Sequence, residues 1–316
     1  MATTTLAPKT ARTGRRFGHG LTHGVNWLYM LPALFFFVVY MVYPILKSMW
    51  MSFYNYQYLS NTPAKFVGLQ NFAYIFTSQN FLNSIKATMI FAAGCFLPLV
   101  TVSLLLAVVV VGLRRYPKVQ NIFKMIYYSP SIVSSVVSAT IWLLIFDPRG
   151  LANQWLNFLA GNPSPLDFKW LALPFMARLA TIIIYFWKYV GYFVIIYFAG
   201  LVSIPLSLYE VAEIDGASAW KKFWRITIPL LKPTLEFVFI VALIQCVRTF
   251  SIQYVFVQSG SAREPLNVIS LNIYETAMKY HSLGRSTAMS VSLFCFILLF
   301  TAVQLRMYRS EKVSYV

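Results

Sequence analysis

The stretch IKATMIFAAGCFLPLVTVSLLLAVVVVGL, residues 85–113, contains Pro98 and has no charged residue after Lys86. A helix that crosses the hydrocarbon core of a membrane needs about 20 mainly apolar residues. The stretch is long enough to cross, and a proline within a span is tolerated because neighbouring helices can satisfy the carbonyl that it frees. We therefore predict a membrane-spanning helix over these residues.

The rest of the chain has the same character. Of its 316 residues 59% are hydrophobic and only 11% are charged, whereas about a quarter of the residues of a soluble domain carry charge. We expect an all-α integral membrane protein with about six transmembrane helices, in a single domain over residues 25–310 between tails at 1–24 and 311–316. The expected spans are Val25–Trp50 (broken late by Pro44), Ile85–Leu113, Ile122–Phe146, Met176–Ile204, Pro233–Val257 and Thr287–Tyr308.

The basic residues indicate the orientation and limit the partners. The net charge is +17, but no Lys/Arg-rich helix with interleaved aromatics occurs, which argues against nucleic-acid binding. Lys and Arg gather in the cytoplasmic loops of membrane proteins. Placing the N-terminus in the cytoplasm puts the larger share of the 26 Lys and Arg residues on the inner side. We predict a multi-pass protein of the bacterial cytoplasmic (inner) membrane, in contact with lipid and with both termini cytoplasmic.

Sequence signatures of catalysis and metal binding are missing. The three cysteines lie in apolar runs without CxxC spacing, which is typical of buried hydrophobic side chains. His19 and His23 are spaced as helix neighbours, but no further ligand is near them. No GxxxxGK[ST], GxSxG or HExxH pattern occurs. We predict no catalytic residues, no metal site and no cofactor in this chain.

A polar segment, EVAEIDGASAWKKFWRITIPLLKP at residues 210–233, separates the fourth and fifth expected spans. We expect Pro205 to end the fourth span and Ser207 with Glu210 to form a capping box for a short helix over 208–214. Asp215-Gly216 should then turn the chain into a second short helix over 217–227. Pro229 and Pro233 should then mark the boundary between this second helix and the fifth span.

This segment could lie on lipid or contact a protein. An interfacial amphipathic helix is the simpler interpretation. Three acids, Glu210, Glu213 and Asp215, would be poorly placed against anionic lipid. Trp220, Phe223 and Trp224 share one face by helical spacing, and rigid aromatic clusters are typical of binding hot spots. The composition therefore favours a protein partner on the cytoplasmic side.

The same segment resembles the "EAA" loop of bacterial ABC-importer permeases, in the maltose- and glycerol-phosphate-type carbohydrate branch. The matching order is Glu210-Val211-Ala212, Asp215-Gly216-Ala217, Phe223, Ile226 and Ile228-Pro229. Three further stretches agree with that family: FVGLQNFAYIF (66–76), YYSPSIVSSVVSATIWLLIFDPRGLANQWL (127–156) and FAGLVSIP (198–205). Two features depart from it: Val211 replaces the middle alanine, and QSGSAREP (258–265) stands where many relatives have Thr-Gly-Gly-Gly-Pro.

The resemblance implies a permease subunit of an ATP-driven importer that forms half of the path for a sugar or oligosaccharide. It implies a second homologous permease, a cytoplasmic ATPase dimer that binds ATP and Mg, and an extracytoplasmic solute-binding protein. The loop at 205–232 would be the coupling helix that docks into the ATPase. Its expected contact residues are Glu210, Ala212, Asp215, Gly216, Ala217, Phe223 and Pro229.

Charges within the spans suggest where substrate passes. Lys188 and Arg248 lie in the fourth and fifth spans, and Gln245 adds a polar group beside Arg248. Such charges face a cavity or a partner, because exposure to lipid is costly. The cations could line a path for an anionic solute such as an acidic sugar, could pair with Glu236 or a backbone carbonyl, or could snorkel toward the membrane surface. Aromatic residues of the fourth span, Trp187 and Tyr192 among them, could stack on sugar rings or simply pack.

Two other functions are alternatives to the importer. A stand-alone secondary carrier for a polar solute needs an ion-coupling site, usually of buried acids, and only Glu236 lies within an expected span. An integral-membrane enzyme would need a catalytic constellation, and no such pattern occurs in the sequence. We therefore expect a transport subunit rather than an enzyme.

Overall fold

The computed structural model describes residues 22–59, 63–161 and 167–309, and the chain divides into two compact units, 1–48 and 49–316. His19 and most of the expected tails at 1–24 and 311–316 lie outside the described residues.

The first unit holds the first span except for its last three residues, 49–51. Helix α1 (Thr22–Phe37) passes through a π-helical turn, η1 (Val38–Val42), into α2 (Tyr43–Met51). The expected break at Pro44 does not occur, because the backbone N–H of Tyr43 bonds to the carbonyl of Val38 and the helix widens by one residue. Proline has no N–H and its ring clashes with the carbonyl four residues before it, so the wider turn relieves both problems without ending the helix.

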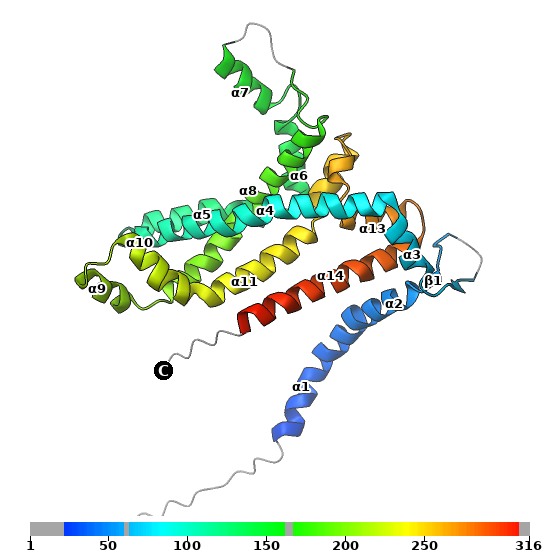
Figure 1. Ribbon diagram of the computed structural model, residues 1–316, viewed down its shortest axis with the longest axis horizontal. Coiled ribbons are helices and arrows are strands. Elements are labelled where there is room, and N and C mark those ends of the chain that lie inside the picture. The colour runs from blue at the N-terminus through cyan, green and yellow to red at the C-terminus, as the bar shows by residue number, and fades with distance from the viewer. Residues whose placement is uncertain (1–21, 60–62, 162–166, 310–316) are drawn as a thin grey trace, which may run out of the picture. The chain divides into compact units, whose positions relative to one another are not determined.

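Four long helices build the second unit: α4 (Gln79–Gly112), α8 (Pro174–Val202), α11 (Ile228–Val247) and α14 (Leu283–Arg309). Figure 1 shows α4 in cyan, α11 in yellow and α14 in red. Smaller elements precede or connect them, namely β1 (Tyr54–Asn55), β2 (Lys65–Phe66), α3 (Gln70–Thr77), η2 (Leu113–Arg115), α7 (Leu151–Ala160), η4 (Glu264–Leu266) and α13 (Ile269–Met278). In the described residues, five helices are long and apolar enough to cross a membrane, or six if one bent pair counts as a span.

The core of the second unit lies where α4 and α8 pack together, with α11 against both. Gly94 lets α4 approach α8 closely, since a Cβ at this position would come within 2.7 Å of Ile182. Phe91 of α4 meets Tyr185 of α8 edge to face, with ring centroids 5.3 Å apart. Helices in a membrane associate through close packing of this kind, because lipid tails are as apolar as the side chains.

The third expected span is a bent pair of helices rather than one straight helix. Helices α5 (Pro117–Ile132) and α6 (Ser135–Ile145) meet at 97°, with Val133 and Ser134 extended between them. Gly191 of α8 packs so closely on the backbone of Tyr127 that a Cβ there would overlap the Tyr127 carbonyl. Hydropathy did not predict this bend, because an apolar stretch has the same mean hydropathy whether the helix it forms is straight or broken.

The polar segment and the fifth span also differ from expectation. Helices α10 (Ala219–Lys222), η3 (Phe223–Thr227) and α11 run on as one helix, so the second short helix is the start of the fifth span. The π-helical turn η3 precedes Pro229 as η1 precedes Pro44, with the Ile228 N–H bonded to the Phe223 carbonyl. The helix ends at Val247, and α12 (Ser251–Gln258) begins after a break and packs against α6.

Candidate functional site

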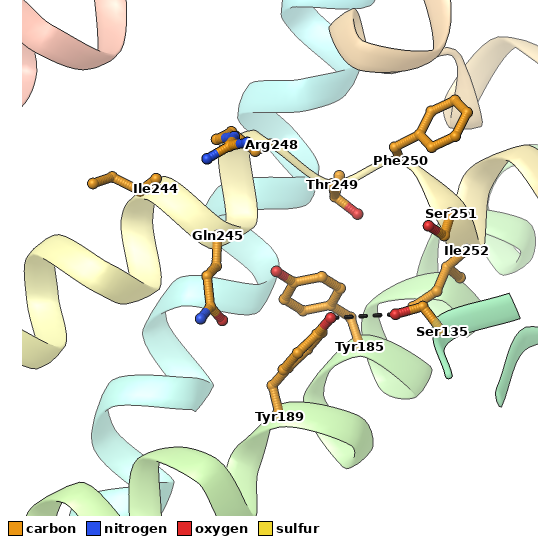
Figure 2. Close-up of a pocket in the computed structure, with 10 residues that line it drawn as sticks. All are labelled: Ser135, Tyr185, Tyr189, Ile244, Gln245, Arg248, Thr249, Phe250, Ser251 and Ile252. Atoms are coloured by element: carbon orange, nitrogen blue, oxygen red, sulfur yellow. Dashed lines mark hydrogen bonds between the residues drawn. The ribbon is translucent and has the colours of Figure 1, made fainter. Parts of the chain in front are cut away.

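The breaks after α5 and α11 lie beside one cavity of about 240 Å³. Figure 2 shows its walls: α8 and the first residue of α6 on one side, and α11, the break and α12 on the other. The lining residues are Ser135, Tyr185, Tyr189, Ile244, Gln245, Arg248, Thr249, Phe250, Ser251 and Ile252. Broken helices expose backbone and polar side chains at membrane depth only where these line a cavity or are buried in protein.

Hydrogen bonds and ring contacts fix the walls of this cavity. The hydroxyls of Ser135 and Tyr189 lie 3.3 Å apart and link α6 to α8, as the dashed line in Figure 2 marks. Thr249 Oγ1 donates to Gln253 Oε1 at 2.8 Å across the first turn of α12. The ring of Phe250 stacks on Tyr254, with centroids 5.4 Å apart. The side chains at the break are therefore held in place before any ligand arrives.

The polar groups of the cavity suit a solute with hydroxyl and acidic groups. Arg248 is exposed at the break, and its guanidinium can bind a carboxylate through two parallel hydrogen bonds. Gln245 Oε1 is buried and has no hydrogen-bond partner in the described structure, so it can accept one from a ligand. Tyr185 and Tyr189 add aromatic surface to the wall. No carboxylate is among the described residues that line the cavity.

Lys188 lies outside this cavity and contacts the break in α5–α6 instead. Its side chain is 3% exposed, and its amino group donates to the backbone carbonyl of Val133. Ser131 Oγ in turn donates to the carbonyl of Lys188 at 2.8 Å. Of the alternatives weighed for Lys188, the geometry is that of pairing with a backbone carbonyl. The lysine amino group takes the place of the backbone N–H that would have donated to the Val133 carbonyl if α5 had continued for another turn.

The two aromatic path residues also lie apart from the cavity. Trp187 packs edge to face on Trp142 of α6, with centroids 5.7 Å apart, and Tyr192 meets Phe193 at 5.2 Å. Of the five expected path residues, the structure gathers Arg248 and Gln245 at the cavity, whereas Lys188 bonds to a backbone carbonyl and Trp187 and Tyr192 make ring contacts. Sequence reasoning missed Ser135 and Thr249. They line the cavity only because two helices break beside it, and no local sequence pattern predicted those breaks.

The polar segment forms a compact corner. Helix α9 (Leu206–Ile214) starts directly after Pro205, and no side chain caps its N-terminus. The expected capping box is therefore wrong, because Ser207 already lies in the first helical turn. The cap is found at the next helix, where the Lys221 N–H donates to Ser218 Oγ at 3.3 Å.

Gly216 makes the turn between the two helices. Its φ of +71° is in the left-handed region, which glycine adopts without the steric penalty of a Cβ. The N–H of Ala217 bonds to the Ala212 carbonyl at 2.9 Å and that of Gly216 to the Glu213 carbonyl at 3.0 Å. This pair of bonds is a Schellman motif, which satisfies the last carbonyls of α9 and sets the direction of the following chain.

Two side-chain contacts hold the corner together. Tyr209 OH lies 2.9 Å from Thr227 Oγ1, and Lys222 Nζ lies 3.6 Å from Glu213 Oε2. The corner also presents apolar side chains outward: Ile214 is 87% exposed and Trp220 is 71% exposed. An apolar group of this size on a polar, rigid turn is typical of a surface that a protein partner covers.

The seven expected coupling residues lie in or directly after this corner. Glu210, Asp215, Gly216 and Pro229 are exposed, and Ala212, Ala217 and Phe223 are half-buried. Phe223 contacts Trp224, with ring centroids 5.3 Å apart, and also lines a second cavity beneath the corner. The three aromatic residues therefore do not form one exposed face, because Phe223 is directed partly into the protein.

Comparison with known proteins gives a consistent result. Residues 100–312 match the family model of the binding-protein-dependent transport system inner membrane component. The trehalose/maltose permease MalF of Thermococcus litoralis is 30% identical over 91% of this chain and 95% of its own. The osmoprotective-compound permease GgtC of Synechocystis sp. is 29% identical over 90% of this chain and 99% of its own.

The fold is also that of a solved transporter. A chain of a bacterial alginate ABC transporter, in complex with an alginate pentasaccharide-bound periplasmic protein, superposes with a TM-score of 0.78 at 23% identity. The similarity covers 92% of this chain and 95% of that one. The matching family model covers more than half of the chain, and the bent and broken spans lie within the matched region. This protein is therefore a member of the binding-protein-dependent transport system inner membrane component family, a multi-pass membrane permease.

Proposed function

We propose that this chain is a permease subunit of an ATP-driven carbohydrate importer and forms half of the path for a sugar that carries a carboxylate. The observation that carries the proposal is the cavity at the two helix breaks. It combines one guanidinium, one unpaired buried amide oxygen and tyrosine surface, and the described residues around it include no acid. Hydroxyl groups, a carboxylate and the apolar face of a sugar ring match these three features.

The cavity is suited to completion by a second subunit. Arg248 is exposed in the single chain, although a charge at membrane depth is costly unless a cavity or partner surrounds it. A second homologous permease that covers this face would enclose the guanidinium and the solute together. The relatives named above include permeases for trehalose/maltose, and the superposed transporter carries alginate, an acidic polysaccharide. These names support a carbohydrate, and Arg248 favours an acidic one.

The polar corner is suited to transmit movement to the cavity. One helix runs from Ala219 at the corner to Val247, directly before Arg248. At 1.5 Å per residue it spans on the order of 40 Å. A cytoplasmic ATPase dimer that grips Ile214 and Trp220 would therefore move the break at Arg248 as part of one rigid element. Such rigid-body movement is the usual basis of alternating access in transporters.

The remaining parts of the proposal follow from this assignment. ATP and Mg would bind to the ATPase dimer, an extracytoplasmic solute-binding protein would deliver the sugar, and both termini would be cytoplasmic. The stand-alone carrier is the less favoured alternative, because the family is defined by dependence on a binding protein. This chain would contribute the path and the coupling corner, without catalytic residues of its own.

The test uses the importer reconstituted in vesicles with its ATPase, second permease and saturating solute-binding protein. Uptake of a uronate oligosaccharide and of a neutral oligosaccharide is compared for Arg248→Gln and Arg248→Lys. A hydrogen bond to a charged group contributes about 1.5–3 kcal/mol, so Arg248→Gln should lower uronate uptake about tenfold or more. Arg248→Lys should keep part of it. Equal losses for both sugars, or no loss, would contradict the acidic substrate, and ATP-independent uptake would contradict the importer.

A further inference from the structure

A second cavity, of about 320 Å³, lies beneath the polar corner. Its walls come from the last turns of α4 and α8 and from α9, α10 and η3, with Val108, Val111, Leu201 and Phe223 among the apolar residues. This volume is at the lower end of the range of ligand sites, about 300–1,000 Å³. None of its described lining residues lines the cavity at Arg248, and Phe223 is the one that also belongs to the expected coupling residues.

The charged groups at this cavity have one sign. Arg114 and Lys222 both line it, and no carboxylate is among its described lining residues. Lys222 faces Glu213 at 3.6 Å, but the Glu213 side chain is 77% exposed, so solvent screens that pair. The two lining hydroxyls, Tyr209 and Thr227, already bond to each other. The site therefore offers an apolar interior and two cations without a strong internal counter-ion.

The cavity lies where the spans end. Gly112 is the last residue of α4 and Val202 the last of α8, and both line it. Arg115 follows Arg114 directly and Lys118 lies four residues after Arg114, and the Lys/Arg distribution predicts that this end faces the cytoplasm. The cytoplasmic leaflet carries the anionic lipids, and basic pockets between spans at this depth suit their head groups.

We propose that this cavity binds an anionic phospholipid, with an acyl chain against Val111 and Phe223 and its phosphate at Arg114 and Lys222. A soluble anion would leave the apolar walls unused, and a zwitterionic lipid would leave the two cations uncompensated. Because α9 and α10 form part of the wall, the bound lipid would contact both helices of the polar corner and stabilise their arrangement. The proposal is independent of the sugar and requires no transport for its test.

The experiment measures lipid retained by the purified importer after exchange into nanodiscs of phosphatidylcholine with a minor fraction of phosphatidylglycerol. Native mass spectrometry after detergent release counts the copies of each lipid that stay bound. Arg114→Gln removes one cation, and Arg115→Gln changes the neighbouring arginine, which does not line the cavity. Val111→Trp fills the cavity, and Val109→Trp places the same bulk at a site that is 60% exposed and outside the lining.

The proposal expects retained phosphatidylglycerol in the parent protein and a loss of about fivefold in Arg114→Gln, which corresponds to about 1 kcal/mol per basic residue. Val111→Trp should abolish retention, while Arg115→Gln and Val109→Trp should keep it. Equal retention of the two lipids, or equal effects of Arg114→Gln and Arg115→Gln, would overturn it. Retention of phosphatidylglycerol by Val111→Trp would also overturn the proposal. An efficient cross-link from Val111→Cys to the ATPase would do the same, because polypeptide and not lipid would then fill the cavity.

Discussion

The amino group of Lys188, in the middle of α8, donates a hydrogen bond to the backbone carbonyl of Val133, the residue after α5. This contact joins a buried side chain of one span to the break in another. The bend of 97° between α5 and α6 follows at once and brings Ser135 to the wall of the cavity beside Arg248. Lys188, which the sequence suggested as a residue of the substrate path, therefore contacts the helix break before Ser135 and does not line the cavity.

Lys188→Met should open this bend. Methionine fills a similar volume without a donor, so the Val133 carbonyl loses its partner and the extended residues lose their restraint. Stability alone is a poor readout, because removing a buried cation offsets part of the loss. We therefore expect a longer distance between spin labels on Met125→Cys of α5 and Leu144→Cys of α6, sites that are 70% and 69% exposed. The exposed Cys295 is replaced in this background.

Lys188→Gln, which keeps an N–H donor, is the matched control and should keep more of the original distance. Uptake by Lys188→Met should fall alike for neutral and acidic sugars, in contrast to the selective loss expected for Arg248→Gln. An unchanged label distance, or a loss confined to the acidic sugar, would show that Lys188 acts on substrate rather than on the break.

Gly216→Ala should weaken the proposed contact with an ATPase. A Cβ at a φ of +71° costs about 1–2 kcal/mol, and the chain can avoid this only by giving up the Schellman turn. Co-purification of the ATPase should decrease, and Gly216→Asn should restore part of it because asparagine tolerates this conformation. Gly161 has a φ of +58° at the end of α7 and open space around it, so Gly161→Ala imposes a similar strain elsewhere. Equal effects of the two alanine variants would contradict a coupling role for Gly216.

Trp220→Ala should reduce ATPase binding without unfolding the protein. The side chain is 71% exposed, so its loss should change the free energy of unfolding by less than about 0.5 kcal/mol. A hot-spot residue contributes about 2 kcal/mol or more to binding, which corresponds to about thirtyfold in affinity. Titration of the solubilised permease with its ATPase measures this. Phe158→Ala, at a residue 77% exposed on α7, should leave the affinity unchanged. Unchanged affinity in Trp220→Ala would exclude this residue from the contact.

Gly191→Ala should destabilise the protein. A Cβ at this position of α8 overlaps the backbone carbonyl of Tyr127, and a backbone cannot rotate away as a side chain can. Overpacking of a core typically costs about 1–3 kcal/mol, which should appear as a lower midpoint of thermal unfolding in detergent. Gly112→Ala is the comparison, because a Cβ at that position meets no atom within 4 Å. A midpoint equal to that of Gly112→Ala would show that α5 and α8 can separate at no cost.

The sequence was sufficient for features that depend on composition and on local chemistry. Apolar runs of the right length located the spans, and the Asp215-Gly216 pair located the turn of the polar corner. The capping box at Ser207 was wrong because Pro205 lets the helix start two residues earlier than the side-chain pattern indicates. Pro44 and Pro229 do not end their helices, because in both places one wider turn absorbs the missing N–H.

The sequence by itself determined that the chain is a helical membrane protein with a charged corner between two spans, because apolar runs of about 20 residues can cross lipid as helices that satisfy all their backbone hydrogen bonds internally. Only the tertiary structure decided where Lys188 and Arg248 act. Both are cations within apolar runs, yet Lys188 reaches a carbonyl of another helix while Arg248 lines the cavity. The reason is physical: whether a charge faces a carbonyl or a cavity depends on how α5, α6, α8 and α12 pack in space, and hydropathy along one chain contains no information about those neighbours.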